Sequence, residues 1–69
     1  MRRVEVDCNF NWLGVDKPAL SHREAQDFGL FHGQRVIAYQ HDDEWDADVM
    51  FDLSLPHHYQ WYIVLQGRR

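Results

Sequence analysis

Apolar and polar side chains alternate along residues 45–52. Every second position from Trp45 to Phe51 is apolar, and three of the other four positions are aspartate. Successive side chains of an extended strand point to opposite faces of the sheet, so the pattern predicts a strand with one buried face and one hydrated face. Such one-sided strands are typical of antiparallel sheets. The segment predicts a scaffold and identifies no reaction.

A second alternating segment lies near the N-terminus, where residues 3–10 predict another half-buried strand. Its apolar face would carry four side chains: Val4, Val6, Cys8 and Phe10. Residues 11–19 contain glycine, aspartate and proline, which are typical of loops. We expect three apolar side chains to hold this loop against the core: Trp12, Leu13 and Val15.

One short helix is predicted over about residues 21–28. Its start fits a capping box, in which Ser21 and Glu24 each satisfy a free backbone N–H group. Gly29 follows at the position where a left-handed residue ends many helices. A helix of this length is unstable alone, so we expect it to be held by packing through Phe28.

Residues 35–40 and 45–52 form the two halves of a predicted antiparallel hairpin. Residues 41–44 contain no glycine. Because two-residue hairpin loops favour Asn-Gly or Asp-Gly, a four-residue loop is expected. In this register Ala38 faces Ala47, and small and β-branched residues share the core face.

The last predicted strand covers residues 59–65, and residues 67–69 are expected to be a solvated tail. Its core face would carry Trp61, Ile63 and Leu65. The sequence therefore predicts one α+β domain over residues 1–69, made mostly of antiparallel strands. The expected architecture is a partly open barrel or curved sheet of about four or five strands with one short helix.

Length and cysteine content favour self-association. A domain of 69 residues buries only about 60% of the surface that its unfolded chain exposes. The single cysteine, Cys8, excludes an internal disulfide, and no Cys-x-x-Cys pair is present for structural zinc. Contact with a second copy is the remaining source of extra burial, so we expect a homodimer.

The net charge of −4, with only seven lysine and arginine residues, argues against direct nucleic acid binding. No apolar segment approaches the about 20 residues that span a membrane, and none is typical of a signal peptide. We therefore expect a cytoplasmic protein with no membrane partner.

Two segments resemble the central strands of SH3-like small barrels, including Tudor-type domains: Gly33-x-x-Val36-x-Ala38-Tyr39 and Glu44-Trp45-x-Ala47-x-Val49-x-Phe51. The resemblance covers about half the chain and implies a small β-barrel fold. Tudor-type domains hold a methylated cation in an aromatic cage. Here Trp45 and Phe51 are predicted on the core face, so that function does not carry over.

A further segment is similar to swapped-hairpin transition-state regulators and antitoxins: Phe28-Gly29-Leu30-x-x-Gly33-x-Arg35-Val36. Those proteins dimerise and bind DNA through basic residues that this chain mostly lacks. The chain as a whole also looks like short bacterial proteins, some of them encoded on mobile gene cassettes. That likeness implies no function.

The candidate interaction surface is the outer face of the predicted hairpin and last strand. It is an apolar patch rimmed by aspartates, with seven residues: Ile37, Tyr39, Asp46, Asp48, Met50, Tyr62 and Val64. Tyr39 would lie opposite Asp46, and Ile37 opposite Asp48. Such a patch predicts a non-catalytic protein-interaction module. The alternative is that the helix or the 11–19 loop covers Ile37 and Tyr39.

The acidic residues of the hairpin suggest a second function: Asp42, Asp43, Glu44, Asp46 and Asp48. They lack the spacing of a calcium loop, so we expect a hydrated face that keeps the hairpin soluble. The alternative is a regulator or inhibitor of a nucleic-acid-handling protein, acting as a phosphate mimic or an antitoxin-like partner.

No cofactor, metal or catalytic residue is expected. His57 and His58 would point to opposite faces of a strand and could share a metal only in a loop, and no Cys or Glu stands at ligand spacing from them. Cys8 lies on the apolar face, where packing is its expected role. No nucleophile or phosphate-binding motif is present, so we do not expect an enzyme. A last alternative is a small-ligand binder that uses five aromatic residues: Trp12, Tyr39, Trp45, Trp61 and Tyr62.

Overall fold

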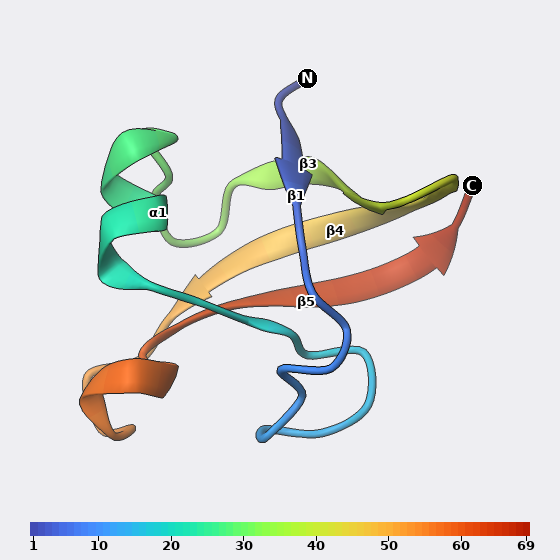
Figure 1. Ribbon diagram of the computed structural model, residues 1–69. Coiled ribbons are helices and arrows are strands. Elements are labelled where there is room, and N and C mark those ends of the chain that lie inside the picture. Colours follow the sequence, from blue (N-terminus) through green and yellow to red (C-terminus); the bar gives the residue numbers. More distant parts are fainter.

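The computed structural model describes all 69 residues and consists of one curled sheet with two short helical segments (Figure 1). Its elements are β1 (Arg3–Glu5), β2 (Ala19–Leu20), α1 (His22–Asp27), β3 (Arg35–Gln40), β4 (Asp43–Phe51), the 3₁₀ turn η1 (His57–Tyr59) and β5 (Trp61–Arg68). The sheet has the order β1-β3-β4-β5-β2, with β1 parallel to β3 and all other neighbours antiparallel. This half-barrel confirms the predicted small, mostly antiparallel α+β fold. No helix has the length and apolar character needed to cross a membrane.

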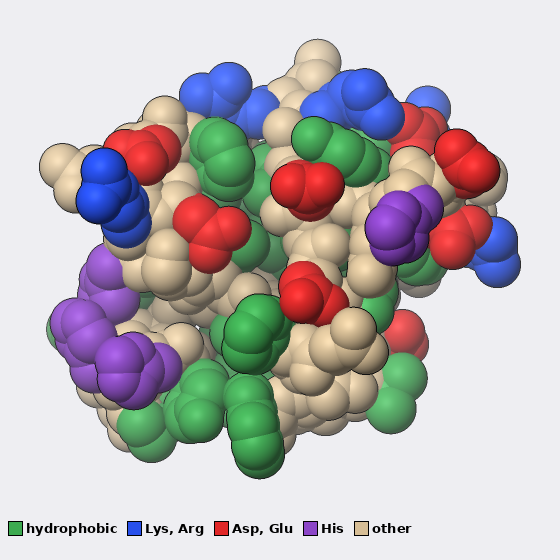
Figure 2. Space-filling view, in the orientation of Figure 1, with side chains coloured by type: hydrophobic (Ala, Val, Ile, Leu, Met, Phe, Trp, Pro, Cys, Tyr) green, Lys and Arg blue, Asp and Glu red, His purple; other side chains and the backbone are tan.

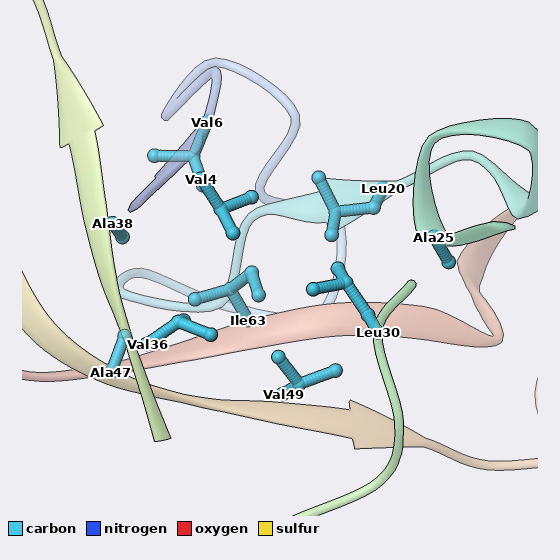
Figure 3. Packing of buried hydrophobic residues seen from close by; sticks show 10 residues of the cluster. All are labelled: Val4, Val6, Leu20, Ala25, Leu30, Val36, Ala38, Ala47, Val49 and Ile63. Atoms are coloured by element: carbon cyan, nitrogen blue, oxygen red, sulfur yellow. The ribbon is translucent and has the colours of Figure 1, made fainter. Parts of the chain in front are cut away.

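The core lies on the inner side of the curled sheet (Figure 3). Ten buried apolar residues form it: Val4, Val6, Leu20, Ala25, Leu30, Val36, Ala38, Ala47, Val49 and Ile63. The alternation along β4 and β5 is confirmed, because Ala47, Val49 and Ile63 are completely buried. Trp45 and Trp61 are half-buried against the same cluster.

Helix α1 has the predicted signals at both ends. The Ser21 hydroxyl accepts a hydrogen bond from the Glu24 N–H at 3.0 Å, and the Glu24 carboxylate accepts one from the Ser21 N–H at 3.0 Å. Gly29 has a φ of +64°, and the Leu30 N–H reaches back to the Ala25 carbonyl at 2.9 Å, as in a Schellman motif. Ala25 and Leu30 are buried and Phe28 is half-buried, so packing holds this helix to the sheet.

The expected four-residue hairpin loop is wrong. Only His41 and Asp42 join β3 to β4. His41 has a φ of +53°, a left-handed conformation that histidine adopts more often than most residues, so the turn forms without glycine. The register is therefore shifted by two positions, and Ala38 faces Trp45 instead of Ala47. An even shift leaves every side chain on its predicted face.

The corrected register changes the cross-strand partners on the outer face. Ile37 faces Asp46, and Tyr39 faces Glu44. Arg35 now lies opposite Asp48, with its Nε 2.8 Å from the Asp48 Oδ1. Opposite charges in facing positions stabilise an antiparallel pair, which favours this register.

The N-terminal strand is shorter than predicted. It ends at Glu5. Val4 and Val6 are buried as predicted, Cys8 is half-buried, and Phe10 is 56% exposed. The predicted packing of the following loop is also wrong for Trp12 and Val15, which are 72% and 79% exposed. Tight turns that close their own backbone hydrogen bonds, such as Phe10 N–H to Asp7 O at 2.9 Å, hold this part of the chain.

The end of that loop covers the edge of β5. Strand β2, which the sequence did not predict, pairs with β5, and the Ile63 N–H donates to the Pro18 carbonyl at 2.9 Å. Strand β5 starts at Trp61 and runs to Arg68. Residues 67–69 are exposed, as predicted, but Gly67 and Arg68 belong to the strand and not to a tail. The C-terminal residues of β5 pair with the start of the long strand β4, where Trp45 faces Arg68.

Candidate functional site

The structure brings the seven predicted interaction residues together on the outer face of β3, β4 and β5. Facing pairs include Ile37 with Asp46, Asp48 with Val64, and Met50 with Tyr62. All seven residues are half-buried. Helix α1 packs into the core on the inner side of the sheet, so it does not cover this face.

Arginines balance the carboxylates of this face. Arg3 Nη2 lies 2.7 Å from Glu44 Oε2, and Arg35 pairs with Asp48 across β3 and β4. At the C-terminal end of β5, two further ion pairs form: Arg69 with Asp46 at 3.4 Å, and Arg68 with Asp43. Four of the seven lysine and arginine residues therefore form ion pairs with acidic side chains of the sheet, although these four arginines are scattered in the sequence.

Two further contacts order this surface. The Arg3 guanidinium lies over the Tyr39 ring, 4.6 Å from its centroid, in cation–π geometry. The Gln66 amide donates to Asp48 Oδ2 at 2.9 Å. The result is a surface on which apolar side chains lie among paired positive and negative side chains.

No group of three or more His, Cys, Asp or Glu side chains is arranged to hold a metal ion.

The Cys8 thiol is held in its protonated form. Burial raises its pKa, and the nearby carboxylates of Asp7, Asp16 and Asp43 raise it further. The Cys8 backbone N–H donates to the Gln40 side chain at 3.1 Å. A nucleophilic cysteine needs the opposite, an electropositive setting that lowers the pKa.

A second site, which the sequence did not predict, is a cleft of about 630 Å³ between the 7–17 loop, the start of α1 and η1. The histidines of these segments gather there, at the lower left in Figure 2. His22 and His57 stack with their ring centroids 4.2 Å apart and 11° between the planes. His58 meets His57 edge-on at 5.7 Å. Trp12 from the loop contacts Tyr59 at 6.2 Å between centroids.

Backbone and side-chain hydrogen bonds position the walls of this cleft. The Ala19 N–H donates to the Phe10 carbonyl at 2.9 Å, which places Phe10 beside β2. Gln60 donates its amide to the carbonyls of Leu53 and Leu55, so its oxygen faces His22 Nε2 at 3.0 Å. His22 is therefore fixed as the donor at Nε2.

The five aromatic residues expected to form one ligand site do not meet. Tyr39 and Tyr62 lie on the outer face, Trp45 and Trp61 pack against the core, and only Trp12 lines the cleft. The adjacent His57 and His58 after a proline were the one local signal for the cleft, but their partners come from residues 10–24. No family model, curated protein or solved structure matches the chain.

Proposed function

We propose that this protein is a non-catalytic protein-interaction module that forms a homodimer through the outer face of β3, β4 and β5. The observation that carries the proposal is the outer sheet face, which α1 does not cover and whose half-buried apolar residues are set among arginine–carboxylate pairs. A partner that covers these side chains would remove the rest of their apolar surface from water, which favours association.

The mixed charge of this face favours a second copy as the partner. A two-fold interface brings the same surface of both copies together, so the surface must complement itself. A face with one sign of charge would repel its copy. Here Arg3, Arg35 and Arg69 stand beside Glu44, Asp48 and Asp46, so each copy offers both signs to the other.

The small core supplies a reason for association. Only 11 of 69 residues are buried, and a chain of this size gains stability when a partner removes more apolar surface from water. We further propose that the protein works in the cytoplasm, where a half-buried Cys8 stays reduced. The ion pairs of the hairpin weigh against the phosphate-mimic alternative, because most of its carboxylates already face a guanidinium.

Sedimentation velocity at micromolar concentration tests the proposal. We expect a species of twice the 8.3 kDa chain mass. Val64→Lys places an ammonium on this face, opposite Asp48, and should shift the protein to monomer. Val15→Lys makes the same change on a loop residue that is 79% exposed and away from the face, and should leave the dimer intact. A wild-type protein that sediments only as a monomer overturns the proposal.

A further inference from the structure

We propose that the cleft between the 7–17 loop, α1 and η1 binds a small planar aromatic acid. This site shares no side chain with the proposed dimer face, and the two proposals stand independently. The cleft combines flat aromatic walls, a ligand-sized volume and several hydrogen-bond donors, among them the Arg23 guanidinium.

Aromatic rings form the walls of the cleft. Phe10 and Trp12 line one side, and they are exposed by 56% and 72% although both are large and apolar. Tyr59 connects Trp12 to η1, where the His57 ring lies flat against His22. Ring faces of this kind favour a planar π-system over a branched aliphatic group, because offset stacking and edge contacts need flat partners.

The size of the cleft suits a small molecule. Its volume of about 630 Å³ lies within the usual range of about 300–1,000 Å³ for ligand pockets. Five of its 11 lining residues are hydrophobic, apolar atoms make up most of its surface, and polar groups such as Ser21 and His58 stand among them. That combination of an apolar body and a few orienting polar groups is typical of small-ligand sites.

Hydrogen-bond donors of the lining suit a carboxylate. The cleft is lined by the guanidinium of Arg23 and by three histidines, whose imidazole rings carry N–H donors, with Glu24 as its one carboxylate. Glu24 is engaged in capping Ser21. Arg23 makes an exposed contact with Asp27 at 3.7 Å, and exposed pairs of this kind are weak, so its guanidinium is free to meet a ligand carboxylate. An aromatic ring in the cleft with a carboxylate at its rim satisfies both features.

The three tryptophan indole N–H groups provide an internal control in a ¹H–¹⁵N correlation spectrum. Only Trp12 lines the cleft, while Trp45 and Trp61 pack against the core. Titration with indole-3-acetate should shift the Trp12 signal and leave the other two nearly unchanged. Indole-3-acetamide, which lacks the charge, and cyclohexylacetate, which lacks the flat ring, should each bind at least about tenfold more weakly.

Two variants and their controls complete the test. Trp12→Ala should weaken indole-3-acetate binding by at least about tenfold, whereas Val15→Ala, an exposed change on the same loop, should not alter it. Arg23→Gln should weaken the acid but not the amide; the backbone spectrum of each variant checks that it is folded. No shift at Trp12 up to about 5 mM ligand, equal shifts at all three tryptophans, or equal binding of the three probes would overturn the proposal. A monomeric wild-type protein would overturn only the dimer.

Discussion

Truncation of Ile63 is the most direct test of the inner side of the sheet. Ile63 is the largest completely buried side chain, and it faces Val49 from β5. Ile63→Val removes one methylene from a site without solvent contact, which corresponds to about 0.8 kcal/mol of transfer free energy. With the cavity that remains, we expect a loss of about 0.5–1.5 kcal/mol in the free energy of unfolding.

Ile63→Ala should cost about 2–5 kcal/mol. A domain of 69 residues has a total stability of about 3–10 kcal/mol, so this variant is expected to be largely unfolded or close to it. Urea denaturation followed by circular dichroism, at one protein concentration, measures both values. Leu53→Ala, at a residue that is 75% exposed, is the control and should change stability by less than about 0.5 kcal/mol. Equal effects of Ile63→Val and Leu53→Ala would refute the assignment of this face to the core.

Three further predictions test local features. Ser21→Ala removes the hydroxyl half of the capping box and should lower the free energy of unfolding by about 1 kcal/mol in thermal or urea denaturation, whereas Ser21→Thr should retain most of it. Because the pKa of Cys8 is raised in the folded protein, its thiol should react with iodoacetamide more slowly in the folded than in the urea-unfolded protein. The folded state also favours the protonated thiol, so the free energy of unfolding should fall as the pH rises beyond the ordinary thiol pKa of 9.0. Equal alkylation rates in the folded and unfolded protein would contradict the raised pKa of Cys8. A double-mutant cycle of Arg35→Met and Asp48→Asn should give a coupling of about 0.2–1 kcal/mol that shrinks with added salt, and zero coupling at low salt would argue against the observed hairpin register.

The strand faces and the helix could be predicted from the sequence because they depend on local patterns. The period of two along residues 45–52 assigns Ala47 and Val49 to the core whichever partner faces them. The capping box and Gly29 act within a few residues of each other, and both have the predicted geometry. These features depend on neighbouring residues alone, so they can be predicted without the positions of distant segments.

The hairpin register could not be predicted because it depends on a compromise between turn chemistry and distant contacts. Without glycine, the turn residues favoured a longer loop, but His41 accepts a positive φ. The two-residue loop then aligns Arg35 with Asp48 and places Gln40 where its side chain accepts a hydrogen bond from the Cys8 N–H. The second of these contacts joins residues 32 positions apart, beyond the reach of a local pattern.

The two proposed surfaces place dimer formation and ligand binding on different elements of one small chain. The dimer face lies on the long, mutually paired strands β3, β4 and β5, where ion pairs and hydrogen bonds fix the side chains. The cleft is instead built from β2, the start of α1, η1 and a loop, and ring contacts and the His22–Gln60 hydrogen bond join its walls. Rigid strands suit a self-complementary interface, and loops on such a scaffold are where binding residues concentrate. Trp12→Ala should therefore weaken ligand binding by at least about tenfold in a protein that remains dimeric, and Val64→Lys should give a monomer that still binds the ligand.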